Sequence, residues 1–133
     1  TALHGGRAWW VFPSYPMAAV GWRMLKRLAV QNPGATAREM DRLIEFPGGG
    51  VVQLRSADNP DSLRGESLDL LIMDEVFDSS LDSSGTEEFL KILESLTQDT
   101  NTFIISHKGD QLFDRFHSVI RFEKHSNFSR IAA

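Results

Sequence analysis

One short stretch constrains the fold of this chain more than any other. Residues 70–75, LLIMDE, are a run of four apolar residues that ends in two adjacent carboxylates. Because apolar and polar residues do not alternate in the run, it is typical of a strand covered on both faces, as in a parallel sheet. Open α/β sheets bind ligands at the carboxyl ends of their strands, which is where the two acids stand. The stretch therefore predicts an α/β layer fold with an acidic pair at its ligand-binding edge.

The rest of the chain follows the alternation of strands and helices that an α/β fold requires. Strands are predicted at 8–12, at 102–106 (covered on both faces), at 119–122 and, as an edge strand, at 127–131; helices are predicted at 16–30, 84–96 and 110–116. Two apolar runs, 43–46 and 51–55, flank three glycines that supply the positive φ of a tight reversal, so they predict a β-hairpin. We expect a three-layer α/β domain with a mainly parallel sheet and one β-hairpin.

Composition places the chain among soluble globular proteins. It has 133 residues, of which 41% are apolar and 24% charged, and no cysteine. The lack of cysteine excludes disulfides, thiolate zinc sites and cysteine nucleophiles. A net charge of -4 argues against a module that binds DNA by bulk charge alone. No stretch has the pattern of a membrane span or a signal peptide, so we expect a cytoplasmic protein with no membrane partner.

The acidic pair is suited to magnesium-dependent phosphate chemistry. Asp74 can hold a Mg²⁺ ion that bridges nucleotide phosphates, and Glu75 can orient or deprotonate an attacking water. His107 ends the next predicted strand, and neighbouring parallel strands end side by side, so its imidazole would lie near Glu75 and the terminal phosphate. The alternative is that these residues are solvated side chains at strand ends, without a catalytic role.

The aromatic and basic residues of the first half have two interpretations each. Trp9, Trp10 and Trp22 can stack on nucleic-acid bases, but an aromatic residue in an apolar run is more often part of the core. The basic cluster of the first predicted helix can contact phosphates, although a solvated helix face explains it more simply. That cluster is Arg23, Lys26 and Arg27.

The second half of the chain resembles a known family. The stretch 74–82, DEVFDSSLD, is followed by His107 at the end of the next strand. With these features, residues 68–133 resemble the C-terminal ATPase lobe of SbcC-type, SMC-like DNA-repair ATPases, the group of the recombination endonuclease subunit of T-even phages. The resemblance identifies the acidic pair as a Walker B motif with its catalytic glutamate, and the serine-rich loop after it as a D-loop.

This resemblance implies a role for each residue of the motif. Asp74 would be the magnesium-side acid, Glu75 the catalytic base and His107 the sensor of the γ-phosphate. Ser80 and Asp82, in the D-loop, would lie at a nucleotide-dependent dimer interface.

The first half carries a second resemblance. The segments 5–15, GGRAWWVFPSY, and 56–66, SADNPDSLRGE, precede the Walker B strand. With them, residues 3–75 resemble the ATPase domain of phage terminase large subunits. The two resemblances meet at residues 71–75, the motif that both families share. This indicates a chimera joined within the Walker B strand.

Both families imply a P-loop ATPase, yet the phosphate-binding loop is missing. No G-x-x-x-x-G-K-[ST] pattern occurs in the 133 residues, and the triple glycine at 48–50 has no lysine behind it. We therefore expect residues 1–133 to form a single partial, incomplete P-loop ATPase domain. Its first part, 1–68, would be terminase-like, and its second part, 69–133, SbcC-like with Walker B, D-loop and histidine switch.

The expected function is part of a phage ATPase that packages or recombines DNA. The cofactors implied are ATP and Mg²⁺, and the partners are DNA, through the full-length complex, and a nuclease subunit or a second ATPase subunit. Because lysine and backbone amides of the P-loop hold the β- and γ-phosphates, we expect the isolated chain to be inactive as an ATP hydrolase. The alternative is a non-catalytic remnant or partner-binding module with no turnover.

Overall fold

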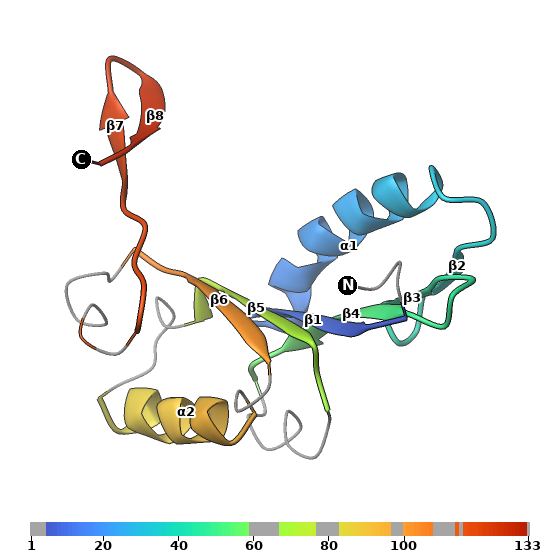
Figure 1. Ribbon diagram of the computed structural model, residues 1–133, viewed down its shortest axis with the longest axis horizontal. Helices are drawn as coiled ribbons and strands as arrows, with labels where there is room; N and C mark the ends of the chain where they lie inside the picture. Colours follow the sequence, from blue (N-terminus) through green and yellow to red (C-terminus); the bar gives the residue numbers. More distant parts are fainter. Residues whose placement is uncertain are drawn as a thin grey trace.

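The computed structural model shows a mixed six-stranded sheet with one helix on each face, and a separate hairpin (Figure 1). It describes residues 5–58, 67–76, 83–96, 100–107, 114 and 116–132, with side chains in 83–96 described at 87–91 and 93–95. The elements in chain order are β1 (Arg7–Phe12), α1 (Tyr15–Ala29), β2 (Thr36–Arg38), β3 (Leu43–Glu45), β4 (Val51–Ser56), β5 (Leu70–Asp74), α2 (Ser83–Leu96), β6 (Asn101–Ile105), β7 (Phe122–His125) and β8 (Phe128–Ile131).

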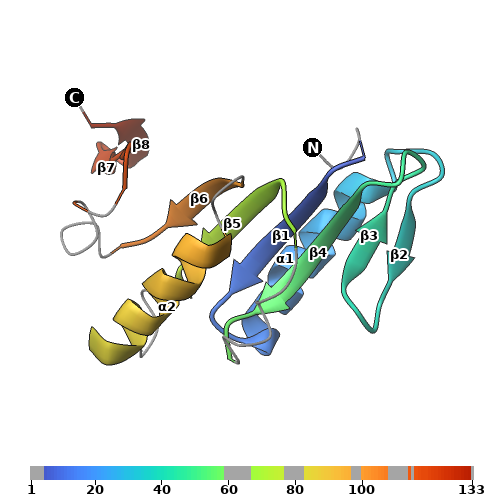
Figure 2. The same cartoon turned by 60° about the horizontal axis from the view of Figure 1, so that its bottom comes forward.

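The sheet has the strand order β2-β3-β4-β1-β5-β6. The four strands β4, β1, β5 and β6 are parallel to one another, and β2 and β3 add to one side as antiparallel strands. Helix α1 covers β1 and β4 on one face, and α2 covers the other face at β5 (Figure 2). The expected three-layer, mainly parallel α/β fold is confirmed.

The two helices lie on opposite faces because the chain moves in opposite directions across the sheet. From β1 through α1 to β4 it moves one way, and from β5 through α2 to β6 it moves the other way. Since strand–helix–strand connections between parallel strands are right-handed, a reversal of direction places the second helix on the other face. The reversal falls between β1 and β5, and such switch points are where open α/β sheets bind ligands.

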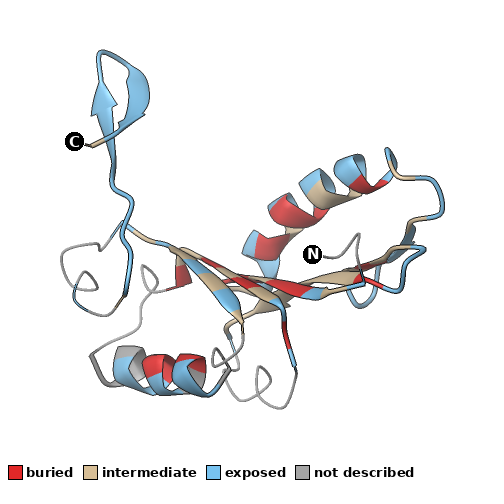
Figure 3. Cartoon of the chain, viewed as in Figure 1, coloured by how far each residue is buried: buried red, intermediate tan, exposed pale blue. Residues whose placement is uncertain are grey.

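Each face of the sheet has its own hydrophobic core (Figure 3). The core under α2 includes Trp9, Val11, Leu71, Met73 and Phe89. The core under α1 includes Phe12, Ala18, Trp22, Ile44 and Leu54. Trp9 and Trp22 are therefore core residues. Of the two interpretations given for them, core packing is the one that the structure supports.

Helix α1 begins at a capped turn and lies very close to the sheet. The hydroxyl of Ser14 accepts a hydrogen bond from the amide of Met17 at 3.4 Å, and Pro16 occupies the first turn, where it costs no hydrogen bond. A Cβ atom at Gly21 would stand 2.5 Å from the ring of Phe12. The absence of a side chain at Gly21 therefore sets how closely α1 packs on β1.

The hairpin predicted around the three glycines is present. β3 pairs antiparallel with β4, Ile44 lies opposite Val52, and Gly49 has a φ of 87° in the turn. The short strand β2 extends this meander, and its residues are all exposed, so it has no apolar pattern that would predict it.

Two predicted strands differ in the structure, and one predicted helix is not tested by it. The strand at 102–106 was expected to be covered on both faces, but β6 is an edge strand in which Phe103 is 60% exposed and Ile105 48%. The predicted strand at 119–122 is wrong, because the strand begins at Phe122 and runs to His125. Together with β8 it forms a hairpin apart from the main sheet, and all residues of both strands are exposed (Figure 3). The predicted helix at 110–116 falls largely outside the described residues. Neither described helix is long and apolar enough to span a membrane.

Candidate functional site at the carboxyl edge

The acidic pair and the histidine meet where β5 and β6 end. Asp74 is the last residue of β5 and lies beside Ile105, the last residue of β6. The amide of Glu75 donates to the carbonyl oxygen of Ile105 at 2.9 Å, so the parallel pairing continues one residue beyond the acid. The Nε2 atom of His107 lies 3.0 Å from Oε1 of Glu75. The structure thus places the imidazole beside the second carboxylate, as parallel neighbouring strands predict.

Glu75 has a backbone conformation that is uncommon for a residue with a side chain. Its φ is 56°, in the left-handed region that favours glycine. Such a conformation costs about 1–2 kcal/mol per residue and is concentrated at functional sites. At this position it ends the strand and coincides with the contact between the carboxylate and His107.

The contact between Glu75 and His107 is open to solvent. Their side chains are 42% and 80% exposed, respectively. An ionised carboxylate only accepts hydrogen bonds, so the hydrogen of this contact lies on Nε2 of the imidazole. Exposed pairs of this kind contribute about 0–1 kcal/mol to stability. The contact therefore adds little to the stability of the fold.

Asp74 is held by a neighbour on the adjacent strand. The indole Nε1 of Trp10 donates to Oδ2 of Asp74 at 3.1 Å. In the register of β1 and β5, Trp10 lies opposite Ile72, so Asp74 is the diagonal neighbour on the same face. The ring of Phe12 packs 5.0 Å from the ring of Trp10 and limits its movement. The indole thus holds one of the two carboxylate oxygens, Oδ2.

Trp10 is the site residue that sequence reasoning missed. The sequence suggested that Trp10 stacks on bases or packs in the core, whereas in the structure its N–H holds the carboxylate of Asp74. The signal that would have revealed this role is that Trp10 and Asp74 lie on the same face of the sheet. It can be recognised only when β1 and β5 are known to be neighbours. Strand order was not predictable from the spacing of the segments, because residues 13–69 separate the two strands.

The donors at this edge suit magnesium better than a metal held by protein alone. Across the described ranges, no three His, Cys, Asp or Glu residues are grouped as a metal site would need. Magnesium is bound through one or two carboxylates together with water and substrate phosphates. The carboxylate of Asp74, oriented by Trp10, fits that donor set.

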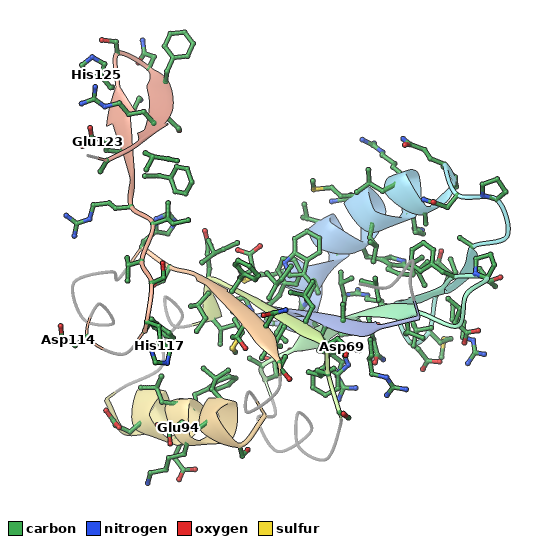
Figure 4. All side chains as sticks on the ribbon, viewed as in Figure 1. Asp69, Glu94, Asp114, His117, Glu123 and His125 are labelled. Carbon is green, nitrogen blue, oxygen red and sulfur yellow. The ribbon has the colours of Figure 1, made fainter. Side chains whose placement is uncertain are left out.

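Other candidate residues are elsewhere or outside the described part. Ser80 and Asp82 lie outside the described residues. Of the basic cluster on α1, Lys26 makes an ion pair with Glu39 at 2.8 Å. Figure 4 shows His117 before the hairpin and His125 within it, far apart from each other, so the two do not share a site.

The fold is that of a phage terminase ATPase domain. The ATPase domain of the large terminase of Thermus phage P74-26, in its R139A mutant, superposes with a TM-score of 0.52 and 24% identity, over 77% of this chain and 48% of that one. The sequence is also similar to the terminase large subunit of Escherichia phage T5, with 30% identity over 113 residues. That match covers 81% of this chain and 25% of the relative, so the chain spans about a quarter of its length.

A second similarity covers a shorter stretch. Exonuclease subunit 2 of Escherichia phage RB69 is 49% identical over 51 residues, 38% of this chain and 9% of that protein. Exonuclease subunit 2 of Enterobacteria phage T4 is 50% identical over 44 residues, 33% of this chain and 8% of that protein. The shares matched by the terminase and by the exonuclease subunit together exceed the whole chain, so the two similarities overlap. No family model matches the chain.

Proposed function

We propose that this chain is part of a phage DNA-processing P-loop ATPase and carries the Walker B edge of its ATP site. The observation that carries the proposal is the contact of Glu75 with His107 directly after Asp74, at the carboxyl edge of parallel strands. The terminase ATPase fold and the two sequence similarities support the same class. The roles below are proposals for the individual residues.

Asp74 is the proposed magnesium-side acid. When bound, the ion would neutralise charge on the nucleotide phosphates. Trp10 would hold the Asp74 carboxylate in one orientation through its hydrogen bond to Oδ2. This arrangement removes rotational freedom from the acid before any ligand arrives, and such preorganisation lowers the cost of binding.

Glu75 is the proposed general base, and His107 the residue that contacts the γ-phosphate or the attacking water. The carboxylate of Glu75 can accept a proton from a water placed in line with the terminal phosphate. The imidazole of His107 offers an N–H to the same place, since it already directs one at Glu75. In this proposal the contact between the two residues gives way to contacts with water and phosphate when nucleotide binds.

Turnover would need a phosphate-binding loop from outside these 133 residues. The sequence holds no G-x-x-x-x-G-K-[ST] pattern, and P-loop amides with their lysine supply most of the hold on the β- and γ-phosphates. We therefore propose that the chain on its own does not hydrolyse ATP at a measurable rate. The same observation favours the second candidate, a non-catalytic remnant or partner-binding module.

The proposed setting is the cytoplasm of an infected bacterium. The matched relatives are named as a terminase subunit and an exonuclease subunit. By analogy, the partners of this chain would be DNA, within a larger complex, and a nuclease subunit or a second ATPase subunit. Ser80 and Asp82 would contact the second ATPase subunit.

Nucleotide binding by the full chain tests the proposal. Fluorescently labelled ATP is titrated with the chain in the presence of Mg²⁺, and the expected result is weak binding that Asp74→Asn abolishes. The matched control is Asp69→Asn, because Asp69 precedes the first residue of β5, at the opposite end of that strand from Asp74. Asp69 accepts a hydrogen bond from the amide of Arg7, so its substitution tests a structural role at the amino end of β5. Equal binding by Asp74→Asn and the parent chain would reject the nucleotide site and leave the non-catalytic candidate.

A further inference from the structure

The separate hairpin of β7 and β8 has two different faces. In an antiparallel pair, residues that lie directly opposite each other share a face, and successive residues of a strand alternate between the faces. Glu123 lies opposite Arg130, and His125 lies opposite Phe128, so these four residues share one face, which we call the polar face of the hairpin. Figure 4 shows Glu123 and His125 on the same side of β7.

The pairing brings one more basic residue to the polar face. The amide of Ala132 donates to the carbonyl oxygen of Arg121 at 2.8 Å, so the ladder continues one position beyond the two strands. Arg121 is two positions before Glu123 and therefore lies on the same face. The apolar pair of the hairpin, Phe122 opposite Ile131, is on the other face.

Phe128 is an apolar ring among charged and polar side chains. Its side chain is 76% exposed, more than that of any other phenylalanine in the described part of the chain. Apolar packing does not account for this position, because the apolar pair of the hairpin is on the opposite face. An exposed aromatic ring beside basic side chains is the arrangement on which proteins stack the bases of single-stranded nucleic acid.

The hairpin is also a basic segment of an acidic chain. Residues 121–131 contain three basic residues, Arg121, Lys124 and Arg130, and one acidic residue, Glu123, while the whole chain has a net charge of -4. Two of the three basic residues lie on the polar face with Phe128. The charge that attracts a phosphate backbone is therefore local, although the net charge of the chain argues against binding by bulk charge.

Arg130 is held in place without using all of its donors. Its Nε and Nη2 atoms each lie 2.6 Å from Oε1 of Glu123, directly across the hairpin. A guanidinium group has five N–H donors in a rigid plane, so this contact leaves others for a phosphate oxygen. Glu123 thus fixes the orientation of Arg130 next to the ring of Phe128.

We propose that the polar face of the hairpin binds single-stranded DNA. One base would stack on Phe128, and the phosphates on either side of it would meet Arg130 and Arg121. A single strand fits this face better than a duplex, because the bases of a duplex are already stacked on one another and present no free ring face. His125, opposite Phe128, would add a hydrogen bond to the same nucleotide.

The proposal depends in one respect on the proposed function. In taking the single strand to be DNA, the inference rests on the proposed DNA-processing class. The binding face itself rests on the register, the exposure and the charges of the hairpin.

Oligonucleotide binding by the full chain tests the proposal without nucleotide or magnesium. A fluorescently labelled oligothymidine of about 16 nucleotides is titrated with the chain, and fluorescence anisotropy measures the affinity. Phe128→Leu keeps apolar area but removes the aromatic ring, so the affinity should fall about fivefold or more. The matched control is Phe122→Leu, the same substitution of an exposed phenylalanine on the other face of the same hairpin. It should bind within about twofold of the parent chain.

The salt dependence tests the phosphate contact. Each phosphate contact to a single strand contributes about 0.7 to the slope of log affinity against log salt concentration, so Arg121→Gln should reduce the slope by about that amount. Lys91→Gln removes a charge from an exposed position on α2 and should leave the slope unchanged. Far-UV circular dichroism confirms that every variant is folded.

Three results would overturn the proposal. The first is no binding of the oligothymidine, and the second is an equal loss of affinity in Phe128→Leu and Phe122→Leu. The third is a duplex of the same length that binds as tightly as the single strand, since charge alone favours the duplex.

The Asp74→Asn variant separates this inference from the nucleotide site. Asp74 ends β5 in the main sheet and is not part of the hairpin, so oligothymidine binding should be unchanged in this variant. Oligothymidine binding without any magnesium-dependent ATP binding would reject the nucleotide site and support the proposal for the hairpin. The reverse result would reject the proposal for the hairpin alone.

Discussion

The indole N–H of Trp10 donates to the first acid of the site, Asp74, from the neighbouring strand. β1 thereby contributes a side-chain contact to the candidate site on β5, although 64 positions separate the two residues in the sequence. A half-buried tryptophan with a satisfied N–H is a rigid donor, because the ring also packs on Phe12. The pair makes the orientation of Asp74 a property of the fold rather than of the ligand.

Removal of this donor should weaken Mg²⁺-dependent nucleotide binding. Trp10→Phe keeps a ring on the same face but loses the N–H. A hydrogen bond to a charged group is worth about 1.5–3 kcal/mol, so we expect the affinity for labelled ATP with Mg²⁺ to fall about tenfold or more. Isothermal or fluorescence titration measures the change.

Trp22→Phe is the control for this prediction. It removes another indole hydrogen bond, 2.7 Å to Oε2 of Glu39, on the far side of α1 from the site. It should lower the free energy of unfolding without changing nucleotide affinity. If Trp10→Phe and Trp22→Phe leave the affinity equally unchanged, the indole of Trp10 does not orient the acid for binding.

The backbone at Glu75 leads to a second prediction, on the stability of the fold. Glycine adopts positive φ without cost, so Glu75→Gly should raise the free energy of unfolding by about 1 kcal/mol, less the small contribution of the exposed contact with His107. Chemical denaturation measures the effect.

Glu75→Gln separates the backbone from the carboxylate. It keeps the side chain and the strained φ, so stability should stay near that of the parent chain. A loss of stability in Glu75→Gly would show that the left-handed conformation is compensated by contacts the glycine cannot make. A gain in the glycine variant alone identifies the site as one where the fold tolerates strain.

Much of this edge was predictable because it depends on local pattern and on one rule of parallel sheets. The run 70–74 predicted its strand, and the position of His107 after the next strand predicted its place beside Glu75. The hydrophobic pattern of each strand is local, and β5 and β6 follow one another in the chain, so their pairing could be predicted from nearby residues. These two strands therefore needed no knowledge of the rest of the sheet.

The errors arise where the neighbours of an element decide its exposure. The segment of β6 is apolar enough for a covered strand, yet Phe103 and Ile105 are exposed because the described chain provides nothing over that face. On α1, the stripe of Val20, Met24 and Leu28 is apolar at helical spacing, but Ala18 and Gly21 face the sheet instead, because the helix packs too closely for large residues. Sequence hydrophobicity does not show which of two apolar faces has a partner.

Close packing at Gly21 gives the third prediction. Gly21→Ala would gain about 1 kcal/mol of helix propensity, but the new Cβ would stand 2.5 Å from the ring of Phe12. Overpacking of a core costs about 1–3 kcal/mol, so the net result should be a loss of about 1 kcal/mol in the free energy of unfolding. Urea denaturation checks the sign. Ala19→Gly, elsewhere on the same helix, isolates the propensity term, and a stabilised Gly21→Ala would show that Phe12 moves aside without cost.

The turn after β2 predicts a dependence of stability on pH. A hydrogen bond from Lys26 is the main cause that lowers the pKa of Glu39, with the indole of Trp22 second. Because the folded-state pKa lies below the unfolded value, this carboxylate adds stability above the ordinary glutamate pKa of 4.5, and the contribution is lost as the pH falls through the folded pKa. Glu39→Gln should therefore be less stable than the parent chain at neutral pH, and the difference should shrink as the pH falls below 4.5 and through the lowered pKa of Glu39. Urea denaturation at a series of pH values measures the difference, and Lys26→Met, which removes the main cause, should reduce it. A difference that stays constant over that range would contradict the assignment to ionised Glu39.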